Sequence, residues 1–144
     1  MNRKILAALI LMAAPALAHN GVDHGAPHHG VIKPFKDVHL EVVAPLAGGV
    51  QVYVIDAEAE ALPASTLSQV AVEIVHPGVK TEYVDMAIDP TGVFWAGKSA
   101  ALKDAKSIVR IGFGLRGASG SIEMPGAPLI ASAKAAAAAP KGKK

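Results

Sequence analysis

The sequence has no cysteine among its 144 residues. This absence excludes disulfide bonds, thiolate metal sites and cysteine nucleophiles, so a domain formed by the chain must be stabilised by packing alone. The length is sufficient for that, because about 100 residues can bury a single hydrophobic core.

A large excess of charge of either sign is also missing, since 14 Lys and Arg stand against 12 Asp and Glu. Arg3 and Lys4 lie at the N-terminus and Lys141, Lys143 and Lys144 at the C-terminus, so the central part of the chain is close to neutral. Nucleic acids and anionic membrane surfaces attract proteins through basic patches. We therefore expect neither of them as a partner.

The motifs of common enzyme classes are missing too. The chain has no G-x-S-x-G elbow, no phosphate-binding P-loop and no H-E-x-x-H zinc motif. Gly112 and Gly114 lie inside a strand pattern, where glycine usually permits a bulge or close packing. Glu58 and Glu60 fall in an acidic loop, where we expect them to be solvated. The sequence therefore predicts that the protein is not an enzyme.

What the N-terminus does have is the pattern of a cleavable secretory signal peptide over residues 1–18. Two basic residues precede the apolar run Ile5–Ala14, and Ala16-Leu17-Ala18 supplies the small residues of a cleavage site. The run is shorter than the roughly 20 residues that span a bilayer, and Pro15 interrupts it. We expect no membrane span after cleavage. Together with the absence of cysteine, the short Ala-rich signal favours a bacterial periplasmic location.

Strand patterns fill the middle of the chain. Apolar residues alternate with other residues in the runs 38–43, 50–55, 70–75, 83–88 and 108–115. Turns rich in Gly and Pro separate these runs, and residues 99–106 fit one helical turn or a loop. Alternation with a period of two is typical of half-buried strands. The sequence therefore predicts one all-β domain over residues 31–125, a single antiparallel β-sandwich.

Two segments without hydrophobic periodicity flank this domain. Residues 19–30 form a leader rich in His and Gly that cannot pack a core, and residues 126–144 form an Ala-rich tail that ends in lysines. Pro140 limits the length of any helix in the tail. We expect both segments to be flexible.

Histidine is concentrated in and just after this leader. Five of the six histidines lie between positions 19 and 39; they are His19, His24, His28, His29 and His39. Imidazole is a good ligand for zinc and copper, and a chain without cysteine must combine it with carboxylates. The cluster predicts a site for Cu(II) or Zn(II).

The first predicted strand places two candidate ligands together. His39 and Glu41 project from one face, because side chains alternate along a strand and the apolar residues around them project to the core. The preceding His28 and His29 can fold back over that face if Gly30 makes a tight turn. The predicted metal site consists of His28 or His29, His39 and Glu41. The alternative is that these are solvated polar residues on the wet face of a sheet.

His19 offers a second possibility. If cleavage falls after Ala18, the α-amino group and a ring nitrogen of His19 can together chelate one Cu(II), and a further histidine would complete a square-planar set.

The sequence His28-His29-Gly30-Val31, followed by Val38-His39-Leu40-Glu41-Val42-Val43, resembles a group of small exported bacterial proteins with the pattern P-H-G-G…H-x-E. That group is associated with heavy-metal efflux and homeostasis, and the resemblance covers residues 27–124. It implies an immunoglobulin-like β-sandwich and a periplasmic role in copper or zinc handling. The matching positions are His29, His39 and Glu41. This chain has His-His-Gly where the pattern has His-Gly-Gly, so His28 is also a candidate.

Two functions of different classes follow. The first is a periplasmic metal-binding protein that buffers or carries Cu(II) or Zn(II), as an accessory to metal efflux. The alternative is an immunoglobulin-like accessory module that binds another envelope protein without metal. Loss of metal affinity in His39→Ala with an intact fold would favour the first.

Overall fold

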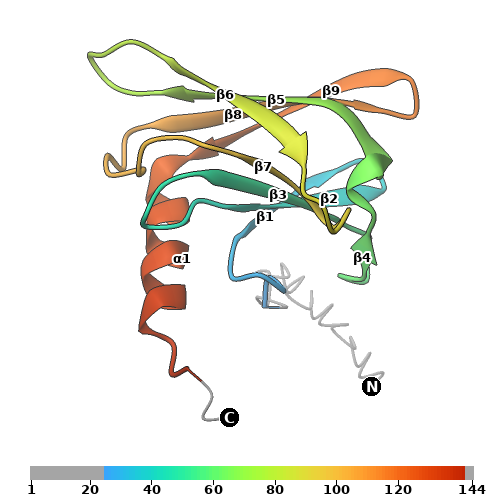
Figure 1. The fold of residues 1–144 in the computed structure, drawn as a ribbon, viewed down its shortest axis with the longest axis horizontal. Coiled ribbons are helices and arrows are strands. Elements are labelled where there is room, and N and C mark those ends of the chain that lie inside the picture. The colour runs from blue at the N-terminus through green and yellow to red at the C-terminus, as the bar shows by residue number, and fades with distance from the viewer. Residues whose placement is uncertain (1–24, 142–144) are drawn as a thin grey trace, which may run out of the picture.

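The computed structural model describes residues 25–141, which form nine β-strands, one short 3₁₀ helix and one α-helix (Figure 1). The predicted signal peptide, His19 and His24 lie outside the described residues. In chain order the elements are β1 (Val31–Phe35), β2 (Val38–Val43), β3 (Val50–Ile55), β4 (Ala61–Leu62), η1 (Ala64–Thr66), β5 (Leu67–Val75), β6 (Glu82–Ile88), β7 (Phe94–Gly97), β8 (Ile108–Leu115), β9 (Ala118–Pro125) and α1 (Gly126–Ala138).

The strand pairs are antiparallel, and hydrogen-bonded neighbours follow the order β1-β2-β3-β7-β6-β5-β8-β9, with β4 paired to β3. The sheet folds over itself, so that β1, β2, β3 and β7 lie opposite β5, β6, β8 and β9 (Figure 1). The predicted antiparallel β-sandwich is confirmed. It differs from the two separate sheets of an immunoglobulin domain in one respect, because the pairing of β6 with β7 joins the layers.

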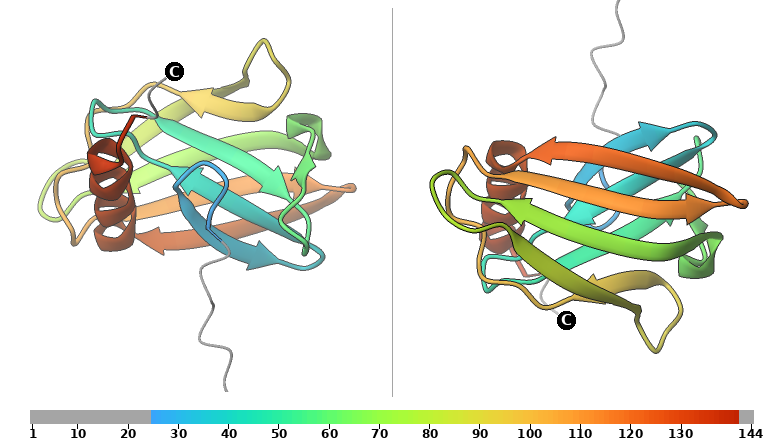
Figure 2. Two further views of the ribbon diagram at one scale, coloured as in Figure 1. Left: turned by 90° about the horizontal axis from the view of Figure 1, so that it is seen from below. Right: turned by 90° about the horizontal axis from the view of Figure 1, so that it is seen from above.

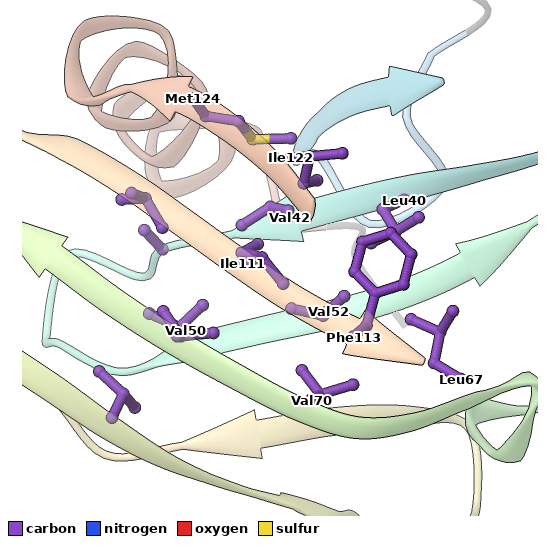
Figure 3. Close-up of a cluster of buried hydrophobic side chains, with 14 of the residues drawn as sticks. Leu40, Val42, Val50, Val52, Leu67, Val70, Ile111, Phe113, Ile122 and Met124 are labelled. Carbon is purple, nitrogen blue, oxygen red and sulfur yellow. The ribbon is translucent and has the colours of Figure 1, made fainter. Parts of the chain in front are cut away.

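The hydrophobic core lies between the two layers and follows the predicted alternation. Leu40 and Val52 project into it from β2 and β3, and Ile111 and Phe113 project into it from β8 (Figure 3). All four side chains are buried. Burial of one such side chain stabilises the fold by about 2 kcal/mol relative to exposure. Packing of this kind takes the place of the missing disulfide bonds.

The two end strands of the sheet, β1 and β9, meet at one end of the sandwich. The Phe35 ring on β1 packs edge-on against Phe113, with ring centroids 4.9 Å apart. The same ring lies over Gly120 on β9, where a Cβ atom would be 2.6 Å from it. At the adjoining turns, Arg116 donates a hydrogen bond to the carboxylate of Asp37 at 2.6 Å. These contacts nearly close the sheet and protect its end strands from pairing with other chains.

Helix α1 corrects one prediction. A flexible tail was expected from residue 126, but Gly126–Ala138 is helical. Leu129 and Ala133 are buried, and the helix contacts β1, β2 and β9. Alanine has the highest helix propensity, and the buried Leu129 supplies the tertiary contact that a short helix needs for stability. No helix within residues 25–141 is long and apolar enough to cross a membrane.

Candidate functional site

The outer face of β2 and β3 is covered by the last residues of the predicted leader. Glu41 on β2 stands opposite Tyr53 on β3, on the side of the sheet away from the core. Strand alternation alone would leave both in water, yet Glu41 is fully buried and Tyr53 is only 8% exposed. Residues 25–30 fold back over this face (Figure 2, left). Residues 25–30 therefore fold onto the sheet, as the predicted site required, and the expectation that the leader is flexible is wrong for these residues.

Three hydrogen bonds hold the Glu41 carboxylate. Oε1 accepts from the backbone N–H groups of His28 and Gly30 at 2.8 and 2.9 Å, and Oε2 lies 2.8 Å from Nδ1 of His28. A buried carboxylate is tolerated in the interior only when its oxygens are hydrogen-bonded, and these three hydrogen bonds meet that need. Gly30 is needed for the close approach, because a Cβ atom there would be 2.9 Å from Cγ of Glu41.

The His28 ring is fixed by a carboxylate at its edge and a phenol at its face. It stacks on Tyr53 with ring centroids 3.6 Å apart and planes 8° from parallel, and Tyr53 in turn contacts Phe94. Because a carboxylate only accepts, Nδ1 of His28 carries the proton, and in the neutral ring Nε2 keeps its lone pair. The His28 side chain is 33% exposed. The site thus holds one oriented imidazole whose second nitrogen has a lone pair to donate.

Tyr53 supports this ring without acting as a base. Its hydroxyl donates to Oε1 of Gln51 at 3.2 Å. Burial raises the pKa of Tyr53 above its ordinary value, and the negative charges of Glu41 and Asp89 raise it further. The phenol is therefore neutral at physiological pH and serves as a platform for the imidazole.

The other predicted ligands do not complete a cluster with this pair. His29 lies in the left-handed region (φ 59°), in a turn that its own N–H closes by donating to the Ala26 carbonyl at 2.8 Å. His39 lies on the same face of β2 as Glu41, as predicted. Within residues 25–141, no group of three or more His, Asp or Glu side chains is close enough to hold a metal ion. The predicted ligand His19 falls outside the described part of the chain.

Sequence reasoning missed two components of this site, the backbone N–H groups of residues 28 and 30 and the stacking platform Tyr53. Tyr53 had a usable signal. The predicted strands 38–43 and 50–55 are joined by a short Pro- and Gly-containing connection, which indicates an antiparallel pair. In that pair Tyr53 lies directly across from Glu41. The backbone donors have no signal in the side-chain sequence.

A second histidine, His76, bridges two polar groups where β5 ends and β8 begins. Its Nδ1 lies 3.0 Å from Oγ of Ser107, and its Nε2 lies 3.4 Å from Oε2 of Glu82. The order of the groups resembles a hydrolase triad, but Ser107 is fully buried, so its hydroxyl is closed to a substrate in this conformation. The contacts tie the β5–β6 turn to the start of β8.

Comparison of the chain with family models, with curated proteins and with solved structures gives no match.

Proposed function

We propose that the protein is an exported, periplasmic metal-binding protein that handles Cu(II) or Zn(II), with Nε2 of His28 as one ligand. The observation that supports this function is the 2.8 Å contact between Nδ1 of His28 and the buried carboxylate of Glu41. A histidine that ligates a metal almost always donates its other ring N–H to a carboxylate, a carbonyl group or water, which fixes the ring and makes it a stronger donor. The His28–Glu41 pair has this arrangement.

In this proposal Glu41 takes a different role from the one expected from the sequence. Direct ligation would require a free carboxylate oxygen, but the two oxygens of Glu41 already accept three hydrogen bonds and are buried. A metal ion could reach them only by displacing residues 28–30. Glu41 therefore orients His28 and does not itself bind the ion.

Further ligands are required, because zinc and copper sites in proteins commonly use three or four donors. The candidates are His29, which directly follows His28 in the chain, and His39, which lies on the same face of β2 as Glu41. His24 and His19, the latter with its α-amino group after cleavage, lie outside the described residues. In the proposed function some of these histidines complete the site around the ion, and the protein buffers or carries metal for an efflux system.

The test is a competitive titration with Cu(II) and Zn(II) of the chain that begins at His19. Glu41→Gln is the most informative variant, because it keeps the shape of the side chain. The backbone N–H groups of residues 28 and 30 require the amide oxygen, so the amide N–H₂ group must face Nδ1 of His28. The imidazole proton must then move to Nε2, where it occupies the lone pair that the metal needs. Imidazole nitrogen chemical shifts report this change of tautomer.

We expect His28→Ala and Glu41→Gln each to lower the metal affinity at least about tenfold, as is typical when a ligand or its supporting carboxylate is lost. His29→Ala and His39→Ala identify the additional ligands by the same criterion. His76→Ala is the control for a histidine elsewhere, because His76 contacts Ser107 and Glu82 instead. Unchanged affinity in both His28→Ala and Glu41→Gln would contradict the proposal.

One observation favours the alternative, an accessory module that binds an envelope protein without metal. The His28–Glu41 pair can also serve a purely structural role, which is to hold residues 28–30 on the sheet without a metal ion. No buried side-chain nitrogen or oxygen in residues 25–141 lacks a hydrogen-bond partner. In that function residues 25–30, held over β2 and β3, are part of a protein-binding surface. Partner binding that is insensitive to chelators, together with weak metal affinity that Glu41→Gln does not change, would select this alternative.

A further inference from the structure

A groove, made of surface hollows lined by residues of β8, β5, β6 and β7, crosses the outer face of the sandwich. Helix α1 does not cover this side (Figure 2, right). The groove consists of three adjoining hollows. The first, of about 340 Å³, lies over Ala71 and Gly112; the second, of about 520 Å³, lies beside Asp85; and the third, of about 400 Å³, reaches from β7 to the loop before β3. Tyr83 lines the first two hollows and residues 96–98 line the last two, so neighbouring hollows adjoin at these residues.

The floor of the first hollow is made of small residues. Ala71, Gly112 and Ser121 lie side by side on β5, β8 and β9. A Cβ atom on Gly112 would have no neighbouring heavy atom within 4 Å, so the space above it is open. Tyr83 stands between the first and second hollows and is 73% exposed. An exposed tyrosine beside an open floor presents an apolar ring face together with a polar hydroxyl.

The charges that line the groove balance one another. In the first hollow, Arg110 donates a hydrogen bond to Glu73 at 3.2 Å. In the second hollow, the lining residues Asp85 and Lys98 have opposite charges. The groove therefore offers carboxylate acceptors and cationic donors without a net charge. This balance disfavours polyanions, which bind through an excess of basic residues.

We propose that this groove binds a neutral oligosaccharide chain, with one sugar ring against Tyr83. A sugar ring has an apolar C–H face, which matches the tyrosine ring, and a rim of hydroxyl groups, which match the paired donors and acceptors. A peptide that binds by adding a strand is excluded, because this mode needs backbone hydrogen bonds at a free sheet edge. The strands β5, β6 and β8 are each paired on both sides and have no free edge.

The test is an NMR titration of the full chain with cellohexaose and, separately, with chitohexaose. Binding shifts the amide signals of residues 83–85, 96–98 and 110–112 and leaves those of residues 25–30 in place, which separates this groove from the His28 site. Tyr83→Ala weakens binding at least about tenfold, whereas Tyr83→Phe, which keeps the ring face, binds within about twofold of the natural chain.

Two further variants separate binding from folding. Gly112→Val fills the first hollow from its floor, with open space where the new Cβ atom lies, so it blocks binding and keeps the fold. Val79→Ala is the matched control, because Val79 is 66% exposed on the same β5–β6 hairpin but lines none of the three hollows. Thermal unfolding of each variant confirms that the fold is kept.

Three results would overturn the proposal. The first is the absence of any shift with either oligosaccharide at about 10 mM, a concentration at which even millimolar binding is visible. The second is equal binding by the natural chain and by Tyr83→Ala. The third is tighter binding of heparin than of the neutral chains, which would make the groove an anion site.

Discussion

The two outer faces of the sandwich carry similar residues in different surroundings. Over β2 and β3, residues of the leader cover Tyr53 and Glu41, so the tyrosine is 8% exposed and the carboxylate is fully buried. Over β5 and β6, Tyr83 is 73% exposed, and the nearby pair of Glu73 and Arg110 is open to water. Strand alternation directs all of these side chains outward. The leader, and not the strands, makes the difference.

The cover of leader residues changes how much each charged group contributes to the stability of the fold. On the open face, water solvates both members of an ion pair, so the pair adds little to stability. On the covered face, removal of one member leaves its partner without solvation, which is strongly destabilising. The covered face therefore depends on every polar contact that it makes. The open face tolerates substitution, and its polar groups are free to meet a ligand.

The largest expected effect is that of Glu41→Ala. The substitution leaves the N–H groups of His28 and Gly30 without an acceptor under the leader, so we expect a loss of about 3 kcal/mol in the free energy of unfolding. Urea unfolding measures this loss. The matched control is Glu123→Ala on the open face, which removes an exposed carboxylate 2.8 Å from Nε of Arg110 and should change stability little. Equal losses in the two variants would show that the leader does not shield Glu41.

Substitution of one glycine on each face tests the difference in packing between the covered face and the open face. In Gly30→Ala the new Cβ atom meets the backbone oxygen of Val42 at 2.5 Å and Cγ of Glu41 at 2.9 Å, so residues 25–30 must shift away from β2, and we expect a loss of about 2 kcal/mol. In Gly112→Ala the new methyl group enters open space, so stability should stay the same or rise slightly. Thermal unfolding of the two variants, measured side by side, gives the difference. A destabilised Gly112→Ala would mean that the open face is more tightly packed than its geometry indicates.

The strands show how far the sequence could predict the fold. Alternation in 38–43 and 108–115 predicted these strands and their core faces correctly, because the pattern reports burial on one side. It missed β1, where Lys33 and Pro34 interrupt the apolar residues, and β9, where only Ile122 and Met124 are buried within the strand. Both are end strands of the sheet, and such strands form with a weaker apolar pattern. It also missed β4 and β7, which have two and four residues and are too short for an alternating pattern to be recognised.

The segments that cover the sandwich were harder to predict, because they depend on contacts between residues far apart in the sequence. Helix α1 has the composition of a flexible tail, and burial of Leu129 against the sheet stabilises it. Glu41 was placed correctly on the same face as His39, but its burial depends on backbone donors in the leader. The sequence thus named His28 and Glu41 as candidates and did not reveal that they form a closed pair.

The smallest expected effect concerns an exposed carboxylate, Asp89, in the turn between β6 and β7. The Thr91 hydroxyl donates to it at 2.6 Å and the Thr91 N–H at 3.0 Å, and these hydrogen bonds hold the pKa of Asp89 below its ordinary value. The folded protein therefore favours the ionised form. Asp89 contributes stability above its unfolded pKa of about 3.9, and this contribution is lost as the pH falls through the lower folded pKa.

Thr91→Ala removes the hydroxyl donor and should move the pKa of Asp89 part of the way back to its ordinary value, which an NMR titration of the Asp89 side chain measures. Thr91→Ser keeps the hydroxyl and should leave the pKa low. Because these hydrogen bonds of Asp89 are exposed to water, its stability contribution should be far smaller than that of Glu41, although both carboxylates accept backbone and side-chain hydrogen bonds. If Thr91→Ala leaves the pKa of Asp89 unchanged, the hydroxyl of Thr91 does not set that pKa.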